Sequence, residues 1–234
     1  MLFKLSKRTL LAVSTFCCFA LVHYSNQAFS QTAPSANQIS AYTGLHKAAH
    51  EGDIKLLAEL ISKGADLEAT DSSDRTALHI AAYASHELIV EALAAAGADM
   101  NALEYRAYDI VTIAAVANDL DVLEVALENG TSAGNVTSPY DGTALIAAAH
   151  LGHHQVVDLL IKHKAPLDHI NNLNWTALME SVVLGDGGPD HLETARLLLA
   201  AGADQSIGDA NGVTPLEHAK SSGYQEMVEL FERY

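Results

Sequence analysis

Apolar residues recur along most of the chain in short runs with helical spacing. Residues 155–161 (QVVDLLI) and 194–199 (TARLLL) each place their apolar side chains on one face of a helix. Several such runs end at a glycine, the residue that most readily ends a helix, and these are Gly64, Gly97, Gly130 and Gly202. A second kind of run is short and rich in alanine, and it follows a threonine that can cap a helix. The pattern predicts pairs of short helices whose apolar faces need partners.

The helix pairs recur on a fixed period. Residues 43–49 (TGLHKAA) return 33 residues later as residues 76–82 (TALHIAA). Further copies begin at Asp109, Thr143, Thr176 and Thr214. A second marker, Gly-Ala-Asp at residues 64, 97 and 202, keeps the same period, with degraded copies at 130 and 164. Two markers in phase over six copies predict a stack of repeats in which each unit buries its apolar face against its neighbours.

These two markers resemble the ankyrin repeat, and the resemblance covers residues 42–234. It implies an all-α solenoid of about six helix-turn-helix repeats joined by short β-hairpins or turns, and an exported, bacterial type of ankyrin protein. The repeats are expected at residues 42–74, 75–107, 108–141, 142–174, 175–212 and 213–234. The resemblance also implies that His46 and His79 form hydrogen bonds to adjacent turns.

The first 30 residues follow a different pattern. Lys4, Lys7 and Arg8 precede an apolar run at residues 10–22, and residues 28–30 (AFS) offer a cleavage site. This order predicts a secretory signal peptide over residues 1–30, followed by an N-terminal linker over residues 31–41. An uncleaved membrane anchor is the alternative, but a run of 13 apolar residues is short for a span of about 20.

The charge balance narrows the class of partner. The chain has a formal net charge of −16. Residues 31–234 contain 10 basic and 29 acidic residues, a net charge of −19, and neither cysteine. Such a chain lacks the basic surface that nucleic acids or anionic membranes require. We therefore expect a protein partner with a basic surface, no nucleic acid, and no stable membrane insertion after cleavage of the signal.

Two further expectations concern the oligomeric state of the protein and its cellular compartment. We expect a monomer held together by packing, since no disulfide is available to residues 31–234. Asn174-Trp175-Thr176 is a formal glycosylation triplet on the expected binding face. A compartment without that modification, the bacterial periplasm, is therefore the expected location.

Candidate chemistry is sparse. The chain has no Gly-x-Ser-x-Gly elbow, phosphate-binding glycine loop or zinc-protease helix motif. We therefore expect no enzyme, no catalytic residue, no cofactor and no metal. The alternative is a metal or small-ligand carrier that uses the cluster of His150, His153 and His154 together with residues 185–191. That loop belongs to a repeat of 38 residues instead of 33, and we expect it to be mobile.

The aromatic residues point to a binding face. In the ankyrin fold, the connecting loops and the exposed side of each first helix line a concave groove, and most tyrosines and the only tryptophan fall at those positions. The expected partner-binding residues are Tyr42, Tyr83, Tyr105, Arg106, Tyr108, Tyr140, His150, Leu173, Trp175, Val183 and Leu184. Of these, Tyr105, Tyr108, Tyr140 and Trp175 are the expected central anchors, because aromatic residues dominate protein interfaces. The partner could be an exported enzyme that the protein modulates. The alternative is that the rings only pack against the next turn.

Overall fold

The first helix of each repeat is short, alanine-rich and capped at its start. The computed structural model describes residues 31–234, so the signal-peptide prediction lies outside the described residues. The first helices are α3 (Gly44–Glu51), α5 (Ala77–Tyr83), α7 (Ile110–Ala117), α9 (Ala144–Leu151), α11 (Ala177–Val183) and α13 (Pro215–Ser222). Thr143, Thr176 and Thr214 accept cap hydrogen bonds as expected, whereas Thr43 makes none.

The second helices run back against the first and bury mainly branched side chains. They are α4 (Ile54–Ser62), α6 (Glu87–Ala95), α8 (Leu120–Glu128), α10 (His154–Lys162), α12 (Pro189–Ala200) and α14 (Gln225–Phe231). The predicted glycine stops are confirmed, since Gly64, Gly97, Gly130 and Gly202 all have positive φ. Lys164 occupies the equivalent position with φ of 63°, so the repeat without glycine turns in the same way.

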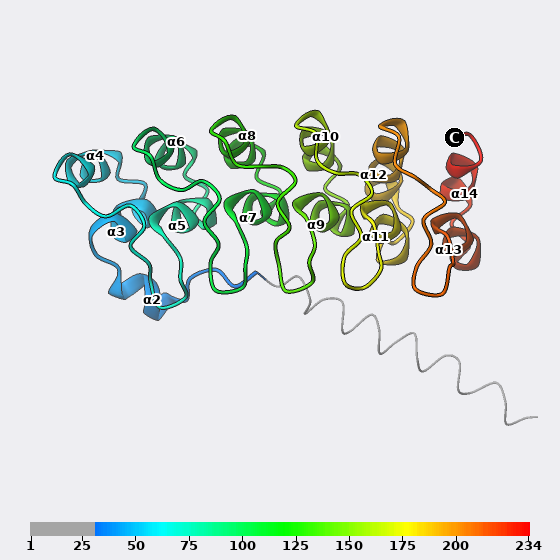
Figure 1. The fold of residues 1–234 in the computed structure, drawn as a ribbon, viewed down its shortest axis with the longest axis horizontal. Helices are drawn as coiled ribbons and strands as arrows, with labels where there is room; N and C mark the ends of the chain where they lie inside the picture. Colours follow the sequence, from blue (N-terminus) through cyan, green and yellow to red (C-terminus); the bar gives the residue numbers. More distant parts are fainter. Residues whose placement is uncertain (1–30) are drawn as a thin grey trace, which may run out of the picture. The chain divides into compact units, whose positions relative to one another are not determined.

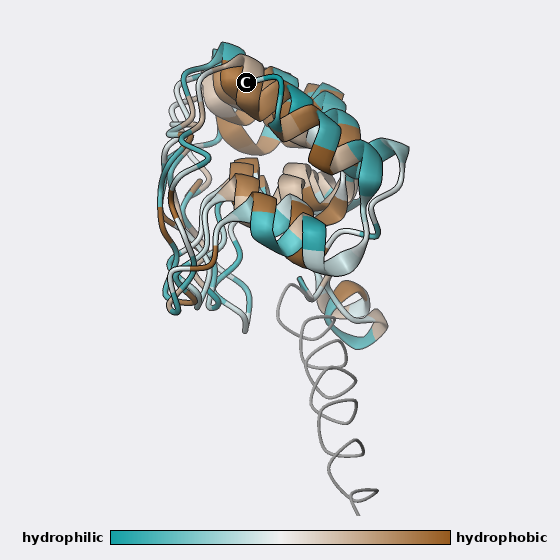
Figure 2. Ribbon diagram, turned by 90° about the vertical axis from the view of Figure 1, so that its right-hand side faces the viewer, coloured by the Kyte–Doolittle hydropathy of each residue, from teal (hydrophilic) through white to brown (hydrophobic). Residues whose placement is uncertain are grey.

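Within Thr32–Tyr234, the twelve repeat helices form two layers (Figure 1). Each first helix packs on the first helices of the neighbouring repeats and on its own second helix. Hydrophobic residues concentrate where the layers face each other, and the connecting loops project to one side (Figure 2). Alanines at the centre of the first layer, such as Ala81, Ala114 and Ala148, are fully buried, which lets neighbouring helices approach closely. The predicted all-α solenoid of helix-turn-helix repeats is confirmed.

We call the loops that join consecutive repeats fingers. The fingers of the described residues do not form the expected β-hairpins. Their only β pairing is an isolated antiparallel bridge between Thr137 and Gly142. Neighbouring fingers are instead joined by single backbone hydrogen bonds. The amide of Tyr105 donates to Ser73, and that of Asn172 donates to Tyr140, at 3.1 and 3.0 Å. The fingers therefore hold one another in register along the stack.

The segment expected to be a linker, residues 31–41, contains a helix. Helix α2 (Ala36–Ala41) begins at Ser35, whose side chain forms a reciprocal capping box with Gln38. No residue of α2 is buried. The sequence analysis missed this helix because it has no apolar face.

Residues 185–191, expected to form a mobile loop, are partly helical and make side-chain contacts. Helix α12 is 12 residues long against nine in α10, because it begins earlier, at Pro189. The Tyr224 hydroxyl donates to the Gly185 carbonyl at 3.1 Å, and the His191 ring bonds to Asp186 at 3.0 Å. The insertion thus adds a helical turn and a packed connection.

Among the described residues, no helix is long and apolar enough to cross a membrane.

Candidate functional site

The expected partner-binding residues lie on the fingers and first helices of repeats 1 to 5, with different exposures. Tyr105 and Leu173, at two finger tips, are 53% and 40% exposed. The half-buried members are Tyr42, Tyr83, Arg106, Tyr140, Trp175, Val183 and Leu184. Tyr42 and Trp175 lie four repeats apart, roughly 40 Å at about 10 Å per packed helix. The structure therefore distributes these residues along the stack instead of forming one pocket.

Tyr108 is not an exposed anchor, which corrects the expectation for this residue. Its side chain is 1% exposed and belongs to the hydrophobic core. The Glu104 carboxylate accepts hydrogen bonds from the amides of Arg106 and Tyr108, and this closed turn directs the ring inward. Burial also raises the pKa of the Tyr108 hydroxyl. Because the ring lies in the core, the residue is structural.

His150 is also buried, at 8% exposure, and is not an available contact residue. Its Nδ1 lies 3.1 Å from Glu180 Oε2, and Glu180 is fully buried. The other oxygen of Glu180 accepts a hydrogen bond from the Asn171 amide at 3.0 Å. Packing in the neighbouring repeat thus satisfies the imidazole, a relationship that repeat periodicity does not reveal.

The three histidines of the alternative metal hypothesis have three different partners. His150 faces Glu180, His153 Nδ1 bonds the Ala115 carbonyl at 3.0 Å, and His154 lies 3.8 Å from Asp190. Within residues 31–234, no group of three histidine, cysteine or acidic residues is arranged to hold a metal ion. The cluster seen in the sequence is therefore dispersed by the turn between α9 and α10.

Histidines instead join consecutive repeats. Nε2 of His46 lies 3.1 Å from the Arg75 carbonyl, and Nε2 of His79 lies 3.0 Å from the Ala102 carbonyl, as the resemblance implied. Burial lowers the pKa of His79 to about 4, so the ring is neutral at pH 7. A second set bridges the helix-to-helix turns, where His86 bonds the His50 carbonyl at 3.1 Å.

The base of the first two fingers holds a buried ion pair. The Arg75 guanidinium, 1% exposed, lies 3.3 Å from Asp71 and stacks 5.5 Å above the Tyr83 ring. The Tyr42 hydroxyl donates to the same carboxylate at 2.8 Å. Burial raises the pKa of Asp71, but the amides of Ser73 and Arg75, the Tyr42 hydroxyl and the Arg75 charge outweigh it and hold the pKa below its ordinary value. This corner is therefore charged and preorganised at neutral pH.

Three exposed aliphatic residues were missed by the sequence analysis. Leu103, Val136 and Ile170 are 48%, 50% and 48% exposed and occupy the same position in three consecutive fingers. We call these three residues the aliphatic row. Their spacing of 33 and 34 residues follows the repeat period, but they lie outside the finger tips and first helices that line the groove in the ankyrin fold.

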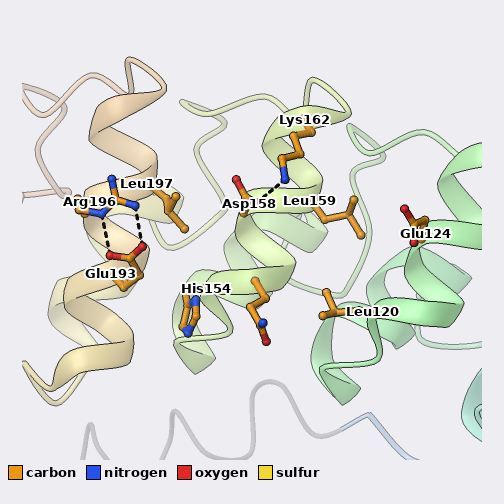
Figure 3. A pocket seen from close by; sticks show the side chains of 10 residues that line it. Leu120, Glu124, His154, Asp158, Leu159, Lys162, Glu193, Arg196 and Leu197 are labelled. Carbon is orange, nitrogen blue, oxygen red and sulfur yellow. Dashed lines mark hydrogen bonds and ion pairs between the residues drawn. The ribbon is translucent and has the colours of Figure 1, made fainter.

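The second-helix layer offers shallower features. An open groove of about 530 Å³ lies between α8, α10 and α12, lined by Leu120, Leu159 and Leu197 among others (Figure 3). The charged side chains in it pair locally, Asp158 with Lys162 and Glu193 with Arg196, both at 2.6 Å. Exposed pairs of this kind contribute little, and a similar groove of about 500 Å³ lies between α12 and α14. It is therefore a weaker candidate than the fingers.

Comparisons with known proteins agree with this architecture. The family model for ankyrin repeats (three copies) matches residues 11–104 and 111–209. The ankyrin repeat protein YahD of Escherichia coli is 34% identical over 114 residues, which are 48% of this chain and 56% of YahD. The ankyrin repeat and KH domain-containing protein mask-1 of Caenorhabditis elegans is 31% identical over 113 residues, 47% of this chain and 4% of that protein. The chain thus spans about half of YahD and a small part of mask-1.

Two solved structures resemble the whole stack. An ankyrin repeat domain from Acinetobacter baumannii AYE has 37% identity and a TM-score of 0.77, covering 81% of this chain and 96% of that one. The ankyrin repeat protein EF0377 has 30% identity and a TM-score of 0.77, covering 83% and 100%. The chain belongs to the ankyrin repeat family, because the family model matches its repeats and these two structures share its helix pairs.

Proposed function

We propose that this ankyrin protein is an exported scaffold that binds a protein partner through the fingers of repeats 2 to 4. The observation that carries the proposal is the aliphatic row of Leu103, Val136 and Ile170, flanked by the exposed Tyr105 and Leu173. Five large apolar side chains on consecutive fingers form a surface that water solvates poorly. Ankyrin repeats imply a protein-interaction scaffold. A partner that covers this surface removes water mainly from apolar side chains, which costs little free energy.

The fingers supply a rigid platform for binding. Their backbones are joined tip to tip, and each is closed internally by Asp71, Glu104, Asn171 or a similar side chain. A preorganised surface loses little conformational entropy on association. Half-buried Arg106, Tyr140 and Trp175 lie on the same fingers and add the residue types that dominate protein interfaces.

The charge of the chain favours a basic partner. A net charge of −19 over residues 31–234 attracts a cationic surface at distances up to a Debye length, about 10 Å at 0.1 M salt. Association with such a partner should accelerate at low ionic strength. The partner is proposed to be another exported protein, with an enzyme as the special case in which binding modulates activity.

The proposed compartment is the bacterial periplasm, and the proposal rests on the signal-like order of residues 1–30. Fractionation of bacteria that produce the chain, followed by N-terminal sequencing, tests it directly. A periplasmic product that begins at Gln31 would support the proposal. A product that keeps residues 1–30 in the cytoplasm would overturn it.

Site-specific photocrosslinking tests the binding face. A photoreactive amino acid replaces Tyr105, and the matched control carries it at Leu88, which is 60% exposed on α6 in the other layer. Each variant is produced in the native host and crosslinked in the envelope. A discrete crosslinked protein at position 105 but not at 88 is expected. Equal crosslinking at both positions would contradict the assignment of the fingers.

A further inference from the structure

The segment that precedes repeat 1 is bound to the fingers by side chains of the repeats. The Thr32 carbonyl oxygen accepts a hydrogen bond from Nη2 of Arg75 at 2.6 Å. Six residues later, the Gln38 side-chain amide donates to Ser72 Oγ at 3.3 Å and to Ser73 Oγ at 3.0 Å. The segment therefore bridges the tip and the base of the first finger.

Arg75 is built to hold an acceptor at this place. Its Nη1 is paired with Asp71, its plane lies over Tyr83, and its whole side chain is 1% exposed. Nη2 is satisfied by a carbonyl that belongs to no repeat. A buried cation that lost this acceptor would carry a large desolvation cost. When residues 32–38 leave, Nη2 of Arg75 needs another acceptor, which water or a carbonyl oxygen of an incoming chain can supply.

The same corner has polar capacity that the repeats do not use. Nε of Arg75 and the Tyr83 hydroxyl are buried without a hydrogen-bond partner. Two such atoms on neighbouring side chains are unusual in a folded protein.

The hydrogen bonds that hold the segment are made by polar groups, and its apolar residues Pro34 and Ile39 are only half-buried. Helix α2 has six residues and buries none of them. The hydrophobic core begins at Leu45, and no residue of 32–41 belongs to it. An isolated helix of this length is unstable in water. The segment can therefore dissociate without unfolding a repeat.

We propose that residues 32–38 are an intramolecular occupant of a peptide-binding site formed by Ser72, Ser73 and Arg75. The site accepts a short, uncharged stretch of the partner protein, with a backbone carbonyl at Arg75 and a side-chain amide at the two serines. The chain's own segment identifies this chemistry because it supplies both groups. This inference deepens the proposed function, since it names one class of partner segment and the contact that must be displaced.

The test uses the segment itself as the probe. A fluorescent peptide of residues 31–42 is titrated against two proteins, one beginning at residue 31 and one beginning at residue 42. The shorter protein keeps all six repeats and the complete core, so it should still unfold in one cooperative transition, at a temperature no higher than that of the longer one, since Arg75 has lost the Thr32 carbonyl. A segment tethered in cis has an effective concentration on the order of 1 mM. We expect the peptide to bind the shorter protein and to bind the longer one at least about tenfold more weakly.

Paired substitutions locate the peptide. Gln38→Ala in the peptide and Ser73→Ala in the protein should each lower the binding affinity. The two substitutions together should lower the affinity no further than the larger of the two single effects. Ser62→Ala, on the exposed side of α4, is the protein control and should leave binding unchanged. Absence of peptide binding to the shorter protein, or equal binding to both proteins, would overturn the proposal. Additive effects of the paired substitutions would do so as well.

This experiment is independent of the partner. If the peptide binds as expected but photocrosslinking at Tyr105 fails, the peptide site stands and the assignment of the finger surface in repeats 2 to 4 falls. If crosslinking succeeds and the peptide does not bind, the proposed function stands and the proposal that residues 32–38 occupy a peptide-binding site falls.

Discussion

Nε2 of His191 lies 3.0 Å from the backbone carbonyl oxygen of His150, in the preceding repeat. His86 and His153 make the equivalent contact with the repeats before them, and Tyr224 does so with its hydroxyl. The contact survives in repeat 5 although that repeat carries the insertion, because α12 begins one turn earlier and presents His191 to the same carbonyl. Among the described residues, a polar ladder beside the apolar core therefore joins neighbouring repeats except repeats 2 and 3, where Asp119 stands at the start of the second helix.

The ladder should stabilise the stack measurably. His153→Ala removes the contact with the Ala115 carbonyl in the central repeats and leaves that oxygen without its partner. We expect a loss of about 1 to 2 kcal/mol in the free energy of unfolding, measured by urea denaturation. His163→Ala is the control, because this side chain is exposed at the end of α10. An equal effect of the two substitutions would show that the ladder is not stabilising.

Tyr108 should behave as a core residue. Its ring is buried, and its hydroxyl has no hydrogen-bond partner among the described residues. Tyr108→Phe should therefore keep or slightly raise the free energy of unfolding, whereas Tyr108→Ala should lower it by about 3 to 5 kcal/mol. Thermal and urea unfolding of the two variants check this. Partner capture that is lost in Tyr108→Phe, with stability intact, would restore the residue as a contact.

Stability should fall in mild acid because of His79. Burial lowers the pKa of this ring from 6.5 to about 4; the Ala102 and Tyr108 carbonyls and Asp71 oppose the shift, and Arg75 adds to it. Between pH 6.5 and 4 the unfolded chain binds a proton that the folded chain does not. The stability contributed by neutral His79 is full above 6.5 and is lost as pH falls to 4, by at most about 3 kcal/mol.

His79→Gln should therefore be destabilised at pH 7 yet lose less stability between pH 7 and 4.5 than the unsubstituted protein. Urea unfolding at several pH values measures both. Because the remaining titratable groups are common to the two proteins, only the difference between the curves is interpreted. Parallel curves would mean that His79 is not the group responsible.

The insertion in repeat 5 should be sterically constrained. A β carbon at Gly185 would lie 2.2 Å from the Ser181 carbonyl oxygen, a backbone atom that cannot turn away. Gly185→Ala should lower the free energy of unfolding by about 1 to 3 kcal/mol through overpacking. At Gly134, the nearest atom would be Pro166 Cδ at 3.3 Å, so Gly134→Ala is the milder control. Equal melting temperatures for both variants would indicate that the connection is loose.

The aliphatic row should matter for binding but not for folding. Alanine at Leu103, Val136 and Ile170 together removes exposed apolar surface, and each change should shift the free energy of unfolding by no more than about 0.5 kcal/mol. The yield of the Tyr105 crosslink should decrease. Leu88→Ala, on the other layer, should leave the yield unchanged. An unaltered crosslink in the triple variant would exclude the row from the interface.

Particular residues show which features could be predicted from the sequence and which could not. The threonine caps, the glycine stops and the bonds of His46 and His79 followed from local pattern and family resemblance, because each is repeated in register. Tyr108 and His150 could not be placed, because both stand at finger or helix-end positions that the pattern assigns to the groove. The inward direction of the Tyr108 ring depends on the closed turn that Glu104 makes within the same finger. The burial of His150 depends on Glu180, which lies 30 residues away and becomes a neighbour only after stacking.

The sequence alone determined the period, the helix pairs, the family and the net negative charge, because these are properties of single repeats or sums over residues. The tertiary structure decided which side chains reach solvent, what the insertion becomes, and that residues 32–38 rest on Arg75. Those outcomes depend on contacts between segments 30 or more residues apart, and such contacts exist only when each repeat is placed against the next.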